Sequence, residues 1–293
     1  MSQISDEDRR ALRDGFARYL EADAHEEKLR AGIGSDRGYD EVIWQKMAEM
    51  GLLGISISEE LGGIGGGAID VALVMEEVGK KLTPVPFVST CVVAAEMIAR
   101  FAPDDVKQDL LEKIDAGELV ISTGGTGDFV PLAHEDHSLS STFSTDSWTI
   151  NGEVSFVSHG GHADYHLLGL QDDGAASAFL VRASDTVSTK LLKTNDPAQR
   201  LYQITLKDAE AIKLQGLNAD GLNQVRMRGV AAWADEQAGA ARAIFDITME
   251  YLRTRYQFGR SIGSFQAMKH MAAELLVEVE SATSAALAAA KAL

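Results

Sequence analysis

The stretch at residues 255–266, RYQFGRSIGSFQ, is the most informative part of this chain, because it interrupts a long helical pattern with a short polar connection that contains glycine. Apolar residues recur at helical spacing over residues 231–251 and again after the stretch, which predicts two helices joined by this turn. Arg255 and Arg260 bracket an aromatic ring and a glycine. A planar guanidinium beside a backbone that allows close approach is suited to binding phosphate. Gln266, at the start of the second helix, adds an amide that can read the edge of a base.

This stretch resembles the carboxy-terminal signature of the acyl-CoA dehydrogenase family, flavoenzymes that desaturate acyl-CoA thioesters between the α and β carbons. The resemblance implies that Arg255, Phe258 and Gln266 contact FAD, generally the FAD of a neighbouring subunit. It also implies a homo- or hetero-oligomer, a dimer or tetramer, with acyl-CoA as substrate and electron-transfer flavoprotein as a candidate electron acceptor. An ordinary helix hairpin with a basic turn is the alternative interpretation of the same residues.

Composition limits the class of protein. A chain of 293 residues with 45% hydrophobic side chains can bury a large core in more than one domain. It has no apolar run long enough for a membrane span, and its charged first 26 residues lack a secretory pattern, which predicts a cytoplasmic protein. A net charge of −17 argues against nucleic acid as a partner. The single cysteine, Cys91, excludes an internal disulfide framework and argues against structural zinc.

The periodicity changes twice, which divides the chain into an N-terminal helical domain (1–118), a middle β domain (119–217) and a C-terminal helical domain (218–293). The fold class predicted is therefore α+β and multidomain, with a middle domain built as a β-sandwich or barrel-like sheet. The family's C-terminal bundle normally has four helices, and two are clear before Leu293, so this domain is expected to be incomplete, in a chain that is either truncated or naturally short.

Local signals place the ends of the predicted elements. Helices in the first domain are expected to stop at Gly51, Gly79 and Gly117. The dipeptide Asn151-Gly152 predicts a β-hairpin turn. The glycine-rich run at residues 55–67 could be taken for a phosphate cradle, but it lacks the lysine and hydroxyl of a P-loop, so a flexible connection between helices is the preferred interpretation. It is also similar to the corresponding segment of the family.

The middle domain carries a second resemblance, at residues 148–164, WTINGEVSFVSHGGHAD. It is similar to the family hairpin whose strand end lies against the flavin. The resemblance implies that Phe156 packs on the isoalloxazine ring and that Ser158 hydrogen-bonds near the flavin N5 and O4 edge. A core phenylalanine and a solvent-capped serine are the alternatives. The match is partial, because Val154 and His159 stand where the family has lysine and asparagine.

In the family, a third sequence motif, a loop with a Glu-Pro pair, follows the first strand of the middle domain. Residues 123–131, TGGTGDFVP, keep Thr123 and Asp128 at its flanks but lack the family's Glu-Pro pair. Thr123 can still offer a hydroxyl to the flavin. The different wall of the substrate channel argues against an ordinary fatty-acyl substrate.

The catalytic base is unknown from the sequence. Desaturation needs a carboxylate to remove the proton from Cα while hydride leaves Cβ for the flavin. The family places its glutamate either in a loop beyond the last helix present or near residues 229–230 in the helix that leads to Arg255. Neither place holds a glutamate, and the carboxylates that follow, Asp235 and Glu236, are typical helix-surface or interhelical residues.

Several functions remain as alternatives. The chain is expected either to catalyse acyl-CoA dehydrogenation or to be a silent subunit that completes the flavin site of a base-bearing partner. Heteromeric family members that act on steroid side-chain CoA esters resemble the second case. A flavin monooxygenase or nitroalkane-oxidising relative is more remote. No metal site is predicted, although His134 and His137, and His159 and His162, are each three apart. A Ser-His-Asp hydrolase lacks its nucleophile-elbow motif.

Overall fold

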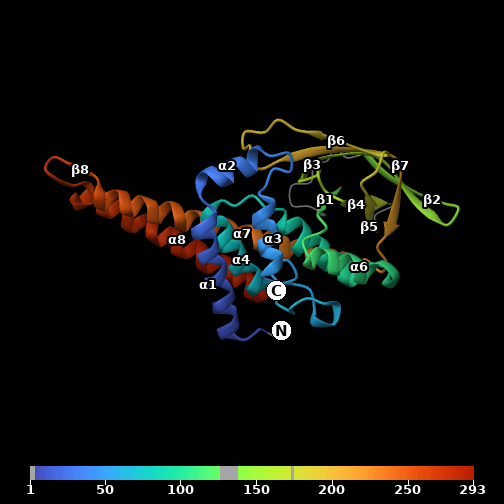
Figure 1. The fold of residues 1–293 in the computed structure, drawn as a ribbon, viewed down its shortest axis with the longest axis horizontal. Helices are drawn as coiled ribbons and strands as arrows, with labels where there is room; N and C mark the ends of the chain where they lie inside the picture. Colours follow the sequence, from blue (N-terminus) through green and yellow to red (C-terminus); the bar gives the residue numbers. More distant parts are fainter. Residues whose placement is uncertain (1–3, 126–137, 173–174) are drawn as a thin grey trace.

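The computed structural model describes residues 4–125, 138–172 and 175–293 (Figure 1). Helices of the N-terminal part lie between a curled sheet on one side and a long two-helix arm on the other. The helical, β, helical order predicted from the periodicity is confirmed. Asp128, His134 and His137 lie outside the described residues.

The N-terminal part is helical because its apolar residues recur at three- and four-residue spacing. Ser5 caps the first helix by accepting from the Asp8 amide, and Asp40 caps the third through the amides of Val42 and Ile43. The elements are α1 (Asp6–Asp23), α2 (Glu26–Gly34), α3 (Glu41–Glu49), the 3-10 turn η1 (Glu59–Leu61), α4 (Ala68–Lys81), the π-helix η2 (Val88–Ala94), α5 (Ala95–Phe101) and α6 (Asp104–Asp115).

Two of the three glycine stop signals are confirmed. Gly51 and Gly117 follow α3 and α6 with φ of +71° and +73°, the left-handed backbone that ends helices. The prediction for Gly79 is wrong, because α4 continues to Lys81. A Cβ on Gly79 would lie 1.9 Å from the carbonyl oxygen of Glu236, so this glycine permits a close helix crossing instead.

The strands β1–β7 form one sheet in the order β1-β4-β5-β7-β3-β2, with β6 also paired to β7. Their bounds are β1 (Ile121–Gly125), β2 (Ser138–Ser144), β3 (Ser147–Ser158), β4 (Tyr165–Asp172), β5 (Ala175–Arg182), β6 (Val187–Leu191) and β7 (Leu201–Lys213). The sheet curls round its own apolar core, which includes Ile150, Phe179 and Ile204. Its other face shares the core of the helices through Ile121, Leu167 and Leu180. The predicted barrel-like middle sheet is confirmed.

The predicted hairpin turn at Asn151-Gly152 is wrong. Both residues lie inside β3, where its pairing with β7 shifts register between Ile150 and Gly152. Gly152 has φ of +122°, and a Cβ there would lie 1.5 Å from the carbonyl oxygen of Ser138. The turn into β3 falls instead at Thr145-Asp146, both with positive φ. Glycine at 152 therefore serves a bulge with a close neighbouring strand.

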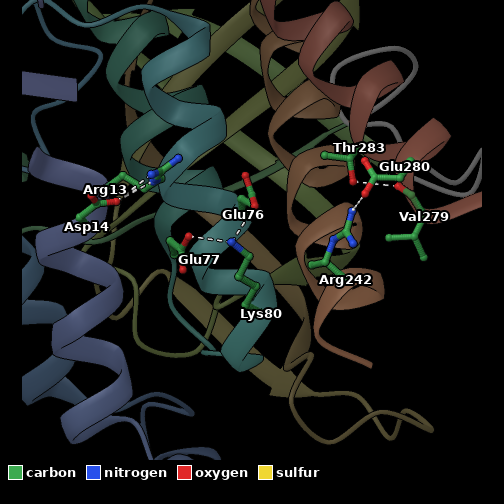
Figure 2. Close-up of polar contacts among 9 residues, drawn as sticks. All are labelled: Arg13, Asp14, Glu76, Glu77, Lys80, Arg242, Val279, Glu280 and Thr283. Atoms are coloured by element: carbon green, nitrogen blue, oxygen red, sulfur yellow. Dashed lines mark hydrogen bonds and ion pairs between the residues drawn. The ribbon is translucent and has the colours of Figure 1, made fainter. Parts of the chain in front are cut away.

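The C-terminal part is a long arm of two helices, α7 (Ala219–Thr254) and α8 (Gln266–Ala292), joined by the hairpin β8 (Tyr256–Gln257) and β9 (Arg260–Ser261). The half of the arm nearest the molecule packs on α4, where a Cβ on Gly239 would lie 2.1 Å from the carbonyl oxygen of Glu76. Further along, Arg242 of α7 pairs with Glu280 of α8 at 2.5 Å (Figure 2). The far half of the arm projects away from the body, and the β8–β9 hairpin lies at its end (Figure 1).

Candidate functional site

Phe156 lies at an irregularity in β3. The pairing of β3 with β7 shifts register between Val154 and Val157, so residues 155 and 156 form a bulge. Phe156 has φ of +63° and is 41% exposed. A bulky residue in the left-handed region is a conformational outlier, with a cost of about 1–3 kcal/mol. Bulges commonly aim a side chain next to an active site, and here an aromatic ring is presented at the surface.

Thr123 and Ser158 lie on strands next to this bulge. A Cβ on Gly124 would lie 2.7 Å from Val157 Cγ2, so β1 passes against the end of β3 inside the curled sheet. Because neighbouring residues of a strand point to opposite faces, Thr123 and Ser158 lie on the other face from Gly124 and Val157. Thr123 is buried and Ser158 is half-buried. Thr123, Phe156 and Ser158 therefore lie on two strands, β1 and β3, that pass against each other near this bulge, and they are here called the sheet-edge set.

The end of β3 is tied to the N-terminal helices. The His159 amide donates to the carbonyl of Arg200 at 3.1 Å, and the Arg200 guanidinium donates to the carbonyls of Ile33 and Asp36, each at 2.8 Å. Gly38, with φ of +80°, makes room for the Arg200 stem. Burial, with Arg200 nearby, lowers the pKa of His159 to about 4. A neutral imidazole therefore stands beside Ser158 at physiological pH.

Arg255, Phe258 and Gln266 lie together at the end of the arm and are here called the arm-tip set. Arg255 follows α7, and Gln266 begins α8. Phe258 and Gly259 form the two-residue turn between β8 and β9, with φ of +57° and +78°. The Phe258 side chain is 90% exposed, and Arg255 and Gln266 are also exposed.

The two sets lie far apart in the chain. The sheet lies at one end of the longest axis of the molecule and the β8–β9 hairpin at the other (Figure 1). The structure therefore forms two groups from the six predicted cofactor-binding residues and does not bring them into one site within one chain. A single ligand can contact both groups only if a second chain supplies one of them.

Gly229, in the part of α7 named as a possible base site, is tightly packed. Gly229 on α7 is buried, and a Cβ there would lie 3.1 Å from Val93 Cγ2 of η2. Beside it, α4, η2 and α7 enclose a crevice of about 10 Å³, lined by Ser56, Gly67, Ala68, Val71, Val92, Arg228, Ala231 and Ala232. This is room for about one water molecule.

Two of the carboxylates in this part of the molecule are Glu96, which is paired with arginines, and Asp235, which does not line the crevice. Glu96 of α5 accepts from Arg228 at 3.0 Å and from Arg100 at 3.4 Å, so both of its carboxylate oxygens are already paired. Asp235 is 6% exposed, and its Oδ2 has no hydrogen-bond partner among the described residues. Burial, with Glu76 nearby, raises its pKa to about 6, but it does not line the crevice. Lys80 pairs with Glu76 and Glu77 at the same crossing (Figure 2).

Two exclusions made from the sequence concern metals and membranes. Within residues 4–125, 138–172 and 175–293, no group of three or more His, Cys, Asp or Glu side chains could hold a metal ion. None of the helices in these ranges is long and apolar enough to cross a bilayer. Cytoplasmic location stays a prediction.

The fold and the sequence define a class of protein. Residues 6–118 match the model of the acyl-CoA dehydrogenase N-terminal domain, and residues 220–293 match that of the C-terminal domain. The chain belongs to the acyl-CoA dehydrogenase family, whose members are oxidoreductases.

Particular relatives narrow this class. The acyl-CoA dehydrogenase IpdE2 of Mycobacterium tuberculosis is 31% identical, over 94% of this chain and 73% of that protein. IpdE2 of Mycolicibacterium smegmatis is 33% identical, over 94% of this chain and 74% of that protein. A solved structure of the Tcur3481-Tcur3483 steroid ACAD G363A variant has a TM-score of 0.84 and 29% identity, over 97% of this chain and 77% of that one.

Sequence reasoning missed some of the residues that shape these regions. It did not single out Arg200, because nothing local shows that its side chain reaches residues 33–36. At position 229 it noted only that the family's glutamate is absent, and it did not predict that Gly229 packs closely against Val93. The bulge at Phe156 could have been predicted in part, since the His-Gly-Gly run after this strand favours irregular backbone pairing.

Proposed function

We propose that this chain is a subunit of an FAD-dependent acyl-CoA dehydrogenase whose flavin site is shared between two chains. The separation of the sheet-edge and arm-tip sets supports this proposal, because a cofactor contacted by both must lie between two chains. The exposed apolar residues on the far half of the arm also support it. They include Ile244, Ile247 and Tyr251 on α7 and Met271 and Leu275 on α8. Surfaces of this kind usually mark protein interfaces.

Charge favours the same arrangement. Residues 251–273 contain four basic residues, Arg253, Arg255, Arg260 and Lys269, and no Asp or Glu, in a chain of net charge −17. The arm tip is therefore a basic island on an acidic protein. Such an island attracts both an acidic partner surface and a diphosphate.

The two sets of residues suit two different parts of FAD, the isoalloxazine ring and the diphosphate. At the sheet edge, Phe156 offers an exposed ring for the isoalloxazine, while Thr123 and Ser158 offer hydroxyls to its polar edge. At the arm tip of the second chain, the exposed Arg255 side chain has no partner among the described residues and can pair with the diphosphate. Phe258 and Gln266 supply a ring and an amide beside it. When bound, FAD accepts the hydride from Cβ of the thioester.

A base-free role for this chain is the second candidate, and Gly229 favours it. A side chain at that position would bring its Cβ within 3.1 Å of Val93 Cγ2, so Val93 would have to shift to admit a glutamate, and Glu96 is already paired with two arginines. The carboxylate that removes the α proton would then come from a partner subunit. The chain would contribute its arm tip and sheet edge to the assembly.

Two relatives support a proposal for the substrate. IpdE2 is an acyl-CoA dehydrogenase, and the Tcur3481-Tcur3483 protein is a steroid enzyme of this type built from two named components. We therefore propose the CoA thioester of a steroid-derived acid as substrate, a heteromer as the assembly and electron-transfer flavoprotein as the electron acceptor.

Visible spectroscopy tests the proposal. The full chain is purified alone and after co-expression with acyl-CoA dehydrogenase subunits from the same genome. We expect flavin absorbance, and bleaching by a steroid-derived acyl-CoA, only in the co-expressed complex. A coloured complex of this chain alone that is bleached by substrate would contradict the base-free role. Colourless protein in every combination would overturn the flavoenzyme assignment.

A further inference from the structure

The arm tip holds an exposed aromatic ring in a strained backbone. The two-residue turn between β8 and β9 needs positive φ at both central positions, where Asn-Gly is strongly preferred. Here the first position is Phe258, with φ of +57° and 90% exposure. A phenylalanine side chain that is almost fully exposed to water gains little from burial to offset this unfavourable backbone conformation. Other contacts must therefore hold the turn.

A stack on Phe265 provides these contacts. The Arg260 guanidinium carbon lies 4.1 Å from the centroid of the Phe265 ring. The Phe258 ring meets the same ring edge-on, at 6.2 Å between centroids and 86° between planes. Phe265 directly precedes Gln266, so one ring joins the turn to the start of α8.

The backbone around the stack is also fixed. The Ile262 amide donates to the carbonyl of Arg255 at 2.8 Å, and the Ser264 hydroxyl donates to the carbonyl of Ser261 at 2.6 Å. A Cβ on Gly263 would lie 2.7 Å from the carbonyl oxygen of Leu252, so the connection presses against the end of α7. The tip is thus ordered by its own contacts.

The two arginines of the tip differ in their contacts. Arg260 stacks on Phe265, whereas the Arg255 side chain has no partner within the described part of the chain. Arg253, also exposed, lies only loosely beside Glu250, at 3.8 Å. Guanidinium groups of equal charge therefore meet different surroundings within a few residues.

We infer that Arg260 and Phe265 are positioning residues that hold Phe258 and Gln266 in place before the cofactor arrives, whereas Arg255 keeps the diphosphate contact already given by the proposed function. This inference rests on the proposed function. An ordered tip loses less conformational entropy on binding than a loose loop, so it binds its ligand more tightly. Arg260 acts through its cation–π stack on the Phe265 ring and not through contact with the phosphates.

Titration of the flavin-free, otherwise complete protein assembly with FAD tests this division of roles. Arg260→Met should weaken FAD binding about fivefold, because the stack is lost, and Arg260→Lys should recover part of that loss. Arg253→Gln is the matched control: it removes the same charge from the same tip and should change affinity by less than about twofold. Arg255→Gln should weaken binding about 50-fold, as expected for a charge-assisted phosphate contact.

The salt dependence separates positioning from direct binding. Loss of a phosphate contact makes FAD affinity less sensitive to ionic strength. We expect this change for Arg255→Gln, while Arg260→Met keeps the salt dependence of Arg253→Gln. An Arg260→Met variant that loses salt dependence as Arg255→Gln does, or that binds FAD like the parent, would overturn the inference and leave the proposed function intact. Unchanged FAD binding by Arg255→Gln would overturn both.

Discussion

Phe156 at the sheet edge and Phe258 at the arm tip have the same left-handed backbone but opposite surroundings. Phe156 lies in a bulge of a sheet whose neighbouring strands fix its position, and it is 41% exposed. Phe258 lies in a turn at the end of an arm, held by a local stack, and is 90% exposed. The body of one chain forms the first region. The second region exposes apolar side chains, and the proposed function assigns this surface to contact with another chain.

The largest effect is expected where the arm packs on the body, because a substitution there pushes α7 away from α4. Gly239→Ala places a methyl group 2.1 Å from the backbone oxygen of Glu76, which cannot move without displacing α4. We expect unfolding free energy to fall by about 3 kcal/mol, as for overpacking of a tight core contact. Urea unfolding followed by circular dichroism measures this change.

Gly259→Ala is the matched control at the other end of the arm. Its Cβ meets nothing within 4 Å, and only the φ of +78° opposes it. A cost of about 1 kcal/mol is expected from the backbone alone. Equal costs at the two glycines would contradict the view that the root of the arm is packed and its tip is open.

Acid should weaken the body through His166. This residue is 1% exposed in β4, its Nδ1 lies 2.7 Å from the Ser122 hydroxyl, and burial lowers its pKa to about 4. The unfolded chain takes up a proton below about pH 6.5 while the folded chain does not, so stability falls as pH drops from 6.5 toward 4. The loss should approach 3 kcal/mol. His166→Gln should reduce this slope in urea unfolding across that range, and an unchanged slope would contradict the role.

The root of the arm should respond to acid in the opposite direction. The folded pKa of Asp235 is raised to about 6, so the folded chain binds the proton more tightly than the unfolded chain does. Its contribution to stability is present below about pH 4 and is lost as pH rises through 6. We expect Asp235→Asn to be more stable than the parent by about 2 kcal/mol at pH 7.5. The difference should vanish near pH 4, and a constant difference would argue against titration of this carboxyl.

The smallest expected effect concerns Phe258 itself. Phe258→Gly removes the left-handed strain and should raise the stability of the isolated chain by less than about 1 kcal/mol. The same change should weaken FAD binding in the assembly, because the exposed ring is lost. Thermal melts of the isolated chain and flavin titration of the complex measure the two effects. A variant that is less stable alone would show that Phe258 packs on its own chain more than its exposure indicates.

Local signals predicted the elements whose ends depend on local backbone chemistry. Gly51 and Gly117 end helices because only glycine adopts the left-handed backbone there without cost. Gly79 was predicted to end a helix and Asn151-Gly152 to form a hairpin turn, and both predictions were wrong although the glycine signal was present. Both glycines serve close contacts with segments distant in the sequence: Gly79 with α7, and Gly152 with β2. A local signal cannot distinguish a turn from such a contact.

Periodicity and motif spacing are local properties of the chain, so the order of helical and β parts, the family and the residue types suited to a flavin could be predicted from them. The separation of these residues into two groups became visible only in the folded chain. The tertiary structure also showed that a side chain at position 229 would meet Val93 and that Arg260 stacks while Arg255 does not. Each of these facts depends on which distant segments come within a few ångströms of each other, and that is set by packing of the whole chain.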